Sequence, residues 1–308
     1  MSVRVLGASA AVLAIAGAMP WLLPRDDVLN LLFLVFLHVA LGQSWNILAG
    51  YAGQVSLGHA AFFGVGALAA RTLWLGGIPF PLALLGSGFA AVAVAVIVGV
   101  PTFRLRGIYF SIGTLGIAEA LRITAGNLLP LVSALPPETL ASYSLTPRYL
   151  LALGLAATTI LASHLLLRSR LGLGMLAVRE DEDAAQSLGV DALRHKLLAL
   201  VLSSLFTGLA GGTFAYYHPS YYPELAFNPT WTFDALLITF VGGMGTLFGP
   251  ALGAVFFVLV REQLAVTLVQ LHQIIFGVLF IAVVLLLPGG LVEAWDRIHQ
   301  RVHPPTTP

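Results

Sequence analysis

Apolar runs of about 20 residues recur along most of the chain, and each is long enough to cross a membrane as a helix. Hydrophobic residues make up 58% of the 308 residues, charged residues make up 9%, and the mean hydropathy is +0.92. Soluble domains carry about 25% charged residues. A chain of this length cannot hide so much apolar surface in water. The sequence therefore predicts an all-α, polytopic integral membrane protein, with residues 1–308 forming one transmembrane domain.

The runs predict about ten spanning helices, with nine as the alternative. The number depends on residues 231–262, which make either two passes or one. The first run, at 5–23, follows Arg4 and contains Ala16–Gly17–Ala18, which resembles a signal-peptide cleavage site, but its length favours a retained span. The later spans are expected at 28–49, 57–75, 79–101, 107–128, 148–167, 195–217, 231–240 with its continuation, and 274–287, before a tail over 291–308.

Glycine-rich stretches break two of these runs. GQVSLGHAAFFGVGA (53–67) and VGGMGTLFGPALGA (241–254) each combine a glycine break, a hydroxyl residue and a small-residue helix. Ser56 is placed to cap the helix after the first break, and Pro250 to be the first helical residue after the second. Paired broken helices indicate a transport site, and tight glycine packing between helices is the alternative. With two hydroxyl residues of the fifth span added, the candidate path residues are Gln54, Ser56, Gly58, His59, Ser111, Thr114, Gly243, Gly245 and Thr246.

One segment, 168–196, holds ten of the 29 charged side chains of the chain, which has 15 Lys+Arg and 14 Asp+Glu. Its middle has the signals of a short helix over 184–188, with Asp181 as the N-cap and Gly189 as the stop. Asp191 is placed to cap the following helix. A solvated connecting loop without a partner is the alternative, but the apolar side formed by Ala184, Ala185 and Leu188 favours a docking helix.

Basic loops of membrane proteins face the cytoplasm, so segment 168–196 is expected there. Counting spans from this segment places Arg104, Arg106 and the amino terminus on the same side, and the loop 218–230 outside. With ten spans the tail after 291 is also inside. Within the fifth span, Glu119 and Arg122 are three residues apart, so they share a helix face and can neutralise each other.

The chain lacks the residues of an energy-converting or catalytic site. No glycine-rich Walker pattern precedes Lys196, which is the single lysine. The histidines lack metal-ligand spacing, and no nucleophile or metalloprotease motif occurs. We therefore expect no enzymatic activity, no bound cofactor and no metal, with any ATP bound by other subunits. The net charge of +1 gives no indication of nucleic-acid binding.

Taken together, the motifs resemble those of LivM-type permeases of branched-chain amino acid ABC importers. The resemblance rests on 53–67, FRLRGIYFSIGTLGIAEALRI (103–123), the charged segment and 241–254, and extends over about 30–291. Asp183–Ala184–Ala185 with Gly189 is similar to the EAA-x3-G coupling motif of such permeases. The resemblance implies a helix that docks on an ATPase, carried by Arg179, Glu180, Asp181, Glu182, Asp183, Ala184, Ala185 and Gly189.

The same resemblance implies a bacterial inner-membrane location, surrounded by lipid, and four partners. These are a second, LivH-type permease, two cytoplasmic ATP-binding subunits and a periplasmic substrate-binding protein. Family members often carry a glycine-rich loop after the fifth span, whereas residues 126–147 here have one glycine, which leaves the solute open. Urea and short amides are alternatives to branched-chain amino acids, and a stand-alone secondary transporter or channel is the alternative to an ABC permease. A bulky residue at Ala185 or Gly189 is predicted to abolish transport without unfolding the membrane domain.

Overall fold

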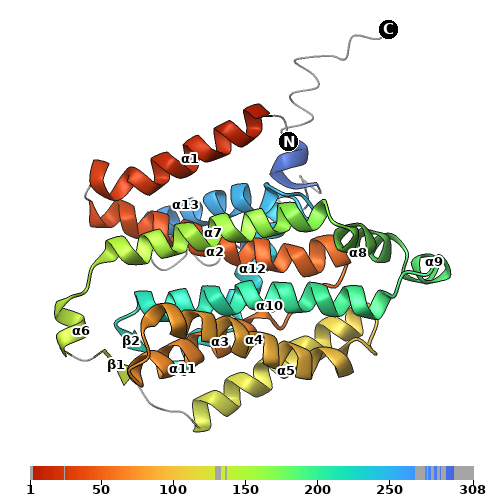
Figure 1. The fold of residues 1–308 in the computed structure, drawn as a ribbon, viewed down its shortest axis with the longest axis horizontal. Helices are drawn as coiled ribbons and strands as arrows, with labels where there is room; N and C mark the ends of the chain where they lie inside the picture. The colour runs from red at the N-terminus through yellow and green to blue at the C-terminus, as the bar shows by residue number, and fades with distance from the viewer. Residues whose placement is uncertain are drawn as a thin grey trace.

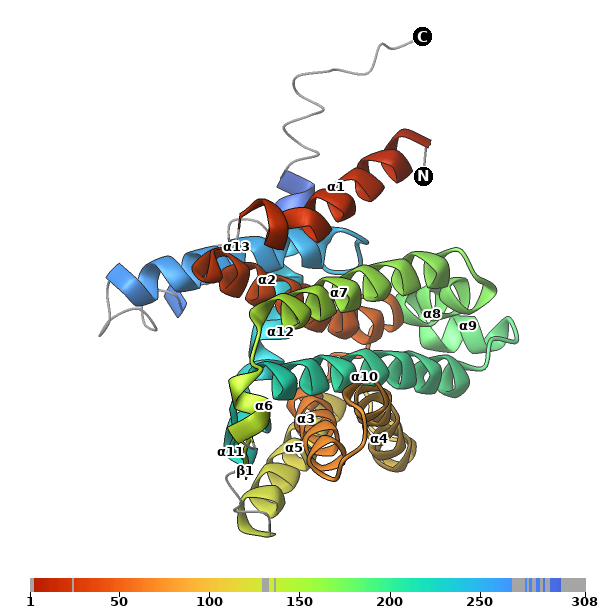
Figure 2. The same ribbon diagram turned by 60° about the vertical axis from the view of Figure 1, so that its left-hand side comes forward.

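The computed structural model describes residues 3–23, 25–128, 133–135, 137–267, 275, 277–278, 281–282, 285 and 289–294. They form a bundle whose long helices lie roughly side by side (Figure 1). In the turned view, α5 lies at one edge of the bundle and α13 near the opposite edge (Figure 2). The helical architecture predicted from the apolar runs is confirmed, and one two-stranded pairing is added to it.

The first half of the chain forms its helices close to the predicted positions. α2 continues directly into a π-helix, η1 (Ile47–Tyr51). Asp26 and Asp27 lie in the first turn of α2, where carboxylates favour the positive end of the helix dipole. The helices of this half are α1 (Val3–Leu22), α2 (Asp26–Asn46), α3 (His59–Leu75), α4 (Phe80–Thr102) and α5 (Ile108–Leu128).

The second half adds shorter elements to its long helices. The loop expected to be irregular between the fifth and sixth spans contains β1 (Ser133–Ala134) and α6 (Pro137–Ala141), and β1 pairs antiparallel with β2 (Ser220–Tyr221). α7 begins three residues earlier than predicted because Pro147 falls in its first turn, where a missing N–H costs nothing. The remaining helices are α7 (Leu145–Leu167), α8 (Arg170–Glu180), α9 (Glu182–Ser187), α10 (Ala192–Tyr217), α11 (Pro223–Ala226), α12 (Thr230–Gly242) and α13 (Gly249–Thr267).

The short elements gather at two opposite ends of the long helices. α8 and α9 lie at one end, and α6, α11 and the two strands lie at the other (Figure 1). Arg106, in the connection between α4 and α5, lies 3.5 Å from Asp183 of α9. The basic connection and the charged segment therefore share one end of the bundle, as the predicted topology requires.

Residues 230–267 form an antiparallel helix pair. The backbone of Gly249 lies against Gly242, and that of Gly253 lies against Ile238. Further from the turn, Arg261 donates to the Asp234 carboxylate over 2.8 Å. The contacts pair successively earlier residues of α12 with successively later residues of α13, so the two helices run antiparallel. The two-pass interpretation of 231–262 requires this arrangement. Most of the expected span at 274–287 and the tail from 295 fall outside the described residues, so ten spans stays a prediction.

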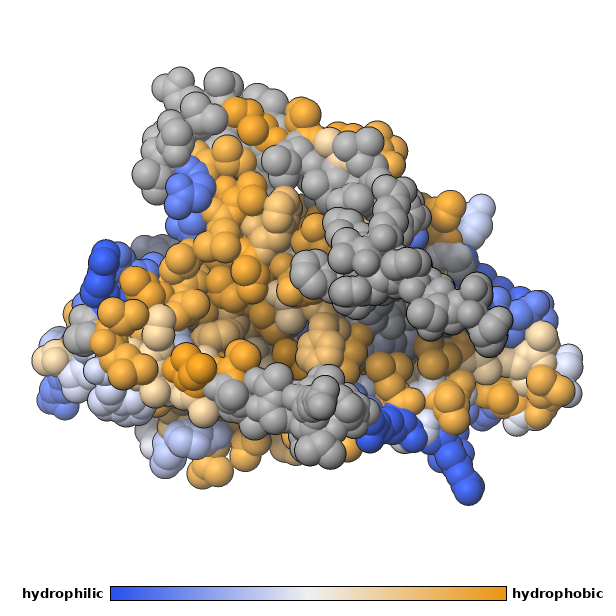
Figure 3. Space-filling view, turned by 90° about the horizontal axis from the view of Figure 1, so that it is seen from above, coloured by the Kyte–Doolittle hydropathy of each residue, from blue (hydrophilic) through white to orange (hydrophobic). Residues whose placement is uncertain are grey.

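The surface of the bundle suits a membrane. Within the described ranges, four helical segments are long and apolar enough to cross one: Asp26–Tyr51, Phe80–Thr102, Leu145–Leu167 and Ala192–Tyr217. Viewed from above, apolar residues cover most of the coloured surface, and hydrophilic residues gather mainly towards its left and right ends (Figure 3). α4 exposes large apolar side chains such as Phe89 and Ile97, which suits contact with lipid.

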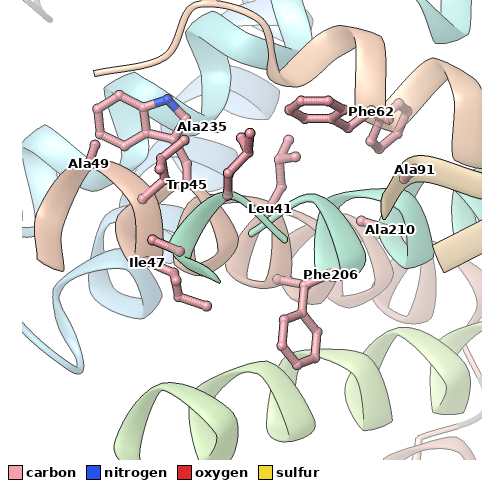
Figure 4. Close-up of a cluster of buried hydrophobic side chains, with 14 of the residues drawn as sticks. Leu41, Trp45, Ile47, Ala49, Phe62, Ala91, Phe206, Ala210 and Ala235 are labelled. Atoms are coloured by element: carbon pink, nitrogen blue, oxygen red, sulfur yellow. The ribbon is translucent and has the colours of Figure 1, made fainter. Parts of the chain in front are cut away.

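Helix α10 runs through the centre of the bundle and packs closely on α3. A Cβ at Gly211 would collide with the Phe63 carbonyl, and one at Gly66 with the backbone of Gly208. Small residues thus let the two backbones touch, as is typical of membrane helices. Around this contact, Leu41, Trp45, Phe62 and Phe206 belong to one buried apolar cluster (Figure 4).

Candidate functional site

The first glycine break leaves an extended segment, 53–58, between η1 and α3. Gly53 begins it with a φ of 70°, a conformation that costs other residues about 1–2 kcal/mol. Two hydroxyls of α5 satisfy the exposed backbone: Ser111 donates to the Val55 carbonyl over 2.6 Å, and Thr114 accepts from the Leu57 N–H over 3.0 Å. The structure therefore brings Ser111 and Thr114 to the break, where they hold its backbone.

Ser56 does not cap α3 as predicted. The N-cap is Gly58, and Ser56 instead accepts from the Gly58 N–H over 3.1 Å while its own carbonyl accepts from the Trp45 indole over 2.9 Å. A Cβ at Gly58 would lie 2.8 Å from the Thr114 carbonyl oxygen. The close approach of α5 thus leaves no room for a side chain at the start of α3, which local sequence could not reveal.

His59 lies inside the bundle. Its Nε2 is 2.7 Å from the Ser203 hydroxyl of α10, and Ser203 donates to the Ser44 carbonyl over 2.7 Å. The next residue, Ala60, donates its N–H to Thr232 of α12 over 2.7 Å. Ser203 is near the midpoint of α10, so α3 and α12 both begin at half the depth of the bundle. Helix termini at such depth are tolerated where protein surrounds them.

The second break joins α12 to α13. Gly243 and Gly245 have φ values of 123° and 81°. Thr246 donates to the Gly243 carbonyl and accepts from the Gly249 N–H over 3.0 Å, which closes the turn. α13 begins at Gly249, so Pro250 is its second residue rather than its first. Of the predicted path residues, Gly243, Gly245 and Thr246 therefore form one tight turn.

Asn46, at the end of α2, joins the two breaks. Its amide oxygen accepts from the Gly245 N–H over 2.8 Å, and its amide nitrogen donates to the Thr246 carbonyl over 2.9 Å. One turn later, a Cβ at Gly50 would lie 2.8 Å from the Gly245 nitrogen. Segments almost 200 residues apart in the chain thus meet around one buried amide. The sequence analysis did not single out Asn46. The feature that could have indicated it is a polar amide at the end of an apolar run.

The charged segment folds largely as its capping signals predict. Asp181 accepts from the Ala184 N–H over 2.9 Å at the start of α9, and Asp191 accepts from the Arg194 N–H over 3.0 Å at the start of α10. Gly189 follows α9 with a φ of 85°. The preceding residues form a further helix, α8, capped by Ser169, that the sequence analysis did not predict.

α9 is fixed to its own chain by one apolar contact and two ionic ones, of which the pair of Asp183 with Arg106 is exposed. Ala185 is 3% exposed and packs with Val178 and Ala192, so it faces inward rather than toward a partner. Glu182 pairs with the buried Lys196 over 2.5 Å. The outward side of α9 consists of Asp183, Ala184, Gln186 and Ser187, followed by Leu188, which is 86% exposed.

Arg179 connects α8 to the glycine breaks. Its guanidinium donates to the Gly50 carbonyl over 2.7 Å and to Glu180 over 2.6 Å. A Cβ at Gly53 would lie 2.9 Å from the Arg179 Cγ, and one at Gly245 would lie 2.7 Å from its Nη1. A single side chain therefore touches both breaks and lies three residues before the first residue of α9. The Arg179 side chain therefore joins α8 to both broken helices.

Other polar features lie away from this junction. An open hollow of about 580 Å³ lies at the end of the bundle opposite α9, and none of the predicted path residues lines it. Glu119 and Arg122 form the predicted pair on α5, with the closest oxygen and nitrogen 2.6 Å apart. Within the part of the chain that the structure describes, no three His, Asp or Glu side chains are grouped to hold a metal ion.

Comparison with known proteins places these features in context. The family model described as branched-chain amino acid transport system, permease component, matches residues 28–284. The high-affinity branched-chain amino acid transport system permease protein LivM of Escherichia coli K12 is 31% identical over 315 residues, which cover 92% of this chain and 73% of that protein. A probable LivM of Methanocaldococcus jannaschii is 25% identical, with 86% and 93% covered.

A more distant relative is named for a different solute. The autoinducer 2 import system permease protein LsrC of Klebsiella pneumoniae is 29% identical over 219 residues, which cover 64% of this chain and 59% of that protein. No solved structure matches the chain significantly. The relatives are thus import permeases with two kinds of solute in their names.

Proposed function

Because the chain belongs to the family of branched-chain amino acid transport system permease components, we propose that it moves branched-chain amino acids across a bacterial inner membrane as part of an ABC importer. The family consists of transport permeases and not of enzymes. The chain works with a separate ATPase, which supplies the nucleotide-binding residues that the sequence lacks. Its proposed further partners are a LivH-type permease and a periplasmic substrate-binding protein.

The observation that carries this proposal is the contact of Arg179 with both glycine breaks. α9 presents Asp183, Ala184 and Leu188 outward at the end of the bundle, where an ATPase can bind. Arg179 lies in the last turn of α8, three residues before the first residue of α9, and donates to the Gly50 carbonyl over 2.7 Å. Closure of the ATPase dimer would pull α9, and Arg179 would pass this motion to the segments at 50–58 and 243–246.

The side chains of the path residues act mainly on the backbone of the two breaks in this mechanism. Ser56, Ser111, Thr114 and Thr246 hold the two breaks in shape through hydrogen bonds, and His59 packs against α10. Gln54 is partly exposed beside them. We propose that the solute passes along the surface of these breaks with little specific binding, so the substrate-binding protein sets the choice of solute.

The face of α5 that points out of the bundle is proposed to meet the second permease. α5 lies at the edge of the molecule (Figure 2), and Gly116 on this face has no neighbouring atom within 4 Å of a Cβ position. The side chains of Glu119 and Arg122 are 40% and 35% exposed. Charged groups at membrane depth face protein or water rather than lipid, whereas α4 has no charged side chain and exposes large apolar ones of the kind that lipid covers.

Replacement of Gly116 by Trp tests this interface. The bulky ring would hold the partner helix away, so co-purification of the second permease from mild detergent should be lost. Ile97→Trp is the matched control, since Ile97 is 73% exposed on α4 and should tolerate an indole in lipid. Normal recovery of the second permease with Gly116→Trp would place the interface on another face.

Reconstitution tests the function itself. Proteoliposomes that contain this chain, its ATPase, the second permease and the binding protein should accumulate radiolabelled leucine only when ATP is supplied to the ATPase side. Urea, acetamide and autoinducer 2 serve as competing solutes. Uptake by the chain alone, without ATPase, would show instead a stand-alone transporter or channel.

A further inference from the structure

A histidine and an aspartate meet inside the bundle, away from the glycine breaks, and an arginine whose side chain is 45% exposed reaches the aspartate from α13. His38 of α2 and Asp234 of α12 are 4% and 5% exposed. The Nε2 atom of His38 lies 3.6 Å from Oδ2 of Asp234. The same oxygen accepts from Arg261 of α13 over 2.8 Å. Three helices are thus joined by three ionisable side chains, and such groups within a membrane are functional candidates.

The depth of this cluster follows from its neighbours. α12 begins beside the start of α3, because the Ala60 N–H donates to Thr232, and His59 contacts the middle of α10. Asp234 is two residues beyond Thr232. His38 is the thirteenth of the 21 residues of α2. His38 and Asp234 therefore lie buried near the centre of the bundle, and Arg261 reaches Asp234 from a partly exposed position.

The hydrogen bonds of His38 leave one ring nitrogen facing a carboxylate. Nδ1 lies 2.8 Å from the Leu34 carbonyl, which can only accept, so Nδ1 carries a hydrogen. In a neutral ring, Nε2 is then an acceptor that faces the acceptor Oδ2. This nitrogen is buried and has no hydrogen-bond partner. A proton placed on Nε2 would turn two opposed acceptors into a donor and an acceptor.

We propose that Nε2 of His38 and Oδ2 of Asp234 form an intramembrane proton-binding site that fastens α12 to α2 when it is occupied. Asp234 is the carboxylate that faces Nε2, and Arg261 is the cation that faces the same oxygen. The rings of Trp231 and Phe257, centred 5.9 and 5.6 Å from the imidazole, close the remaining sides. Loss of the proton weakens the attachment of α12, which leads directly into the second glycine break.

The second buried histidine of the bundle provides a matched control. His59 is as deeply buried, but its Nε2 faces the Ser203 hydroxyl over 2.7 Å and it forms no ion pair within the described residues. His59→Gln thus removes a buried imidazole without touching the proposed site. His38→Gln keeps a donor for the Leu34 carbonyl but cannot take up a proton. Asp234→Asn keeps an acceptor for Arg261 but removes the charge that holds the proton.

The test measures the melting temperature of the full-length protein in lipid nanodiscs from about pH 5.5 to pH 8.5, the range in which histidine titrates. A proton bound only in the folded state stabilises the protein at low pH, and this stabilisation is lost as the pH rises and the proton leaves. The melting temperature of the wild type and of His59→Gln should therefore fall across this range. That of His38→Gln and of Asp234→Asn should fall by clearly less.

Two outcomes would overturn the proposal. One is an equal pH dependence in His38→Gln, Asp234→Asn and wild type. The other is a double variant whose slope differs from those of the single variants, because removal of either partner should already abolish the site. If His38→Gln fails to fold, the pH dependence of Asp234→Asn is compared with that of His59→Gln instead. Asn has the shape of Asp and keeps an acceptor for Arg261, so Asp234→Asn is expected to fold.

Discussion

The Arg179 side chain contacts both glycine breaks, with its guanidinium on the Gly50 carbonyl and beside Gly245, and its Cγ beside Gly53. A hydrogen bond from a charged donor contributes about 1.5–3 kcal/mol. We therefore expect Arg179→Gln to lower ATP-driven uptake about tenfold or more, while the ATPase still co-purifies. Arg170→Gln, at the exposed start of the same helix, is the control. Equal uptake by the two variants would remove Arg179 from the coupling mechanism.

The ion pair of Glu182 with Lys196 fixes α9 to α10. The lysine side chain is 3% exposed and the carboxylate side chain 25%. Removal of one partner from a buried pair costs about 3–5 kcal/mol when a charge is left without compensation. Glu182→Leu should thus detach α9 and prevent ATPase binding, Lys196→Met should do so less, and the double variant should recover binding. Pull-down of the ATPase measures all three, and failure of the double variant to recover would contradict the pairing.

Helix α9 has an inner and an outer side, and substitutions on the two sides are expected to have different effects. Leu188 is 86% exposed, so Leu188→Glu should abolish ATPase binding while the melting temperature of the chain stays unchanged. Ala185 is buried against Val178, so Ala185→Trp should displace α9 and lower the melting temperature as well. The two variants separate direct contact from support of the helix. Normal ATPase binding by Leu188→Glu would place the docking surface elsewhere.

Local signals predicted this element better than its orientation. Asp181, Gly189 and Asp191 act through residues two to four positions away, and their caps are present as predicted. The inward direction of Ala185 depends on α8 and α10, which no local pattern encodes. The same reason explains Ser56: its capping signal is correct in type, but the approach of Thr114 from α5 moves the start of α3 to His59.

At the scale of the whole molecule, the helical architecture and the order of the long helices within the described residues could be predicted, because hydropathy along the chain depends on local composition alone. The meeting of the two glycine breaks could not, because it depends on contacts between residues about 200 positions apart. The sequence indicated that two helices are broken in a similar way, but it did not indicate that the two breaks touch. Asn46 supplies the contact, so the two halves of the molecule are expected to move together.

Asn46→Ala tests this joint movement. The buried amide donates to the Thr246 carbonyl and accepts from the N–H of Gly245, and the loss of either bond leaves a buried polar group unpaired at a cost of about 1–3 kcal/mol. We expect ATP hydrolysis to continue while fewer solute molecules move per ATP in the reconstituted importer. Asn30→Ala, at the opposite end of α2 where Asn30 accepts from Tyr217, should keep the normal ratio. An unchanged ratio in Asn46→Ala would mean that the two breaks move independently and that Arg179 alone couples them to α9.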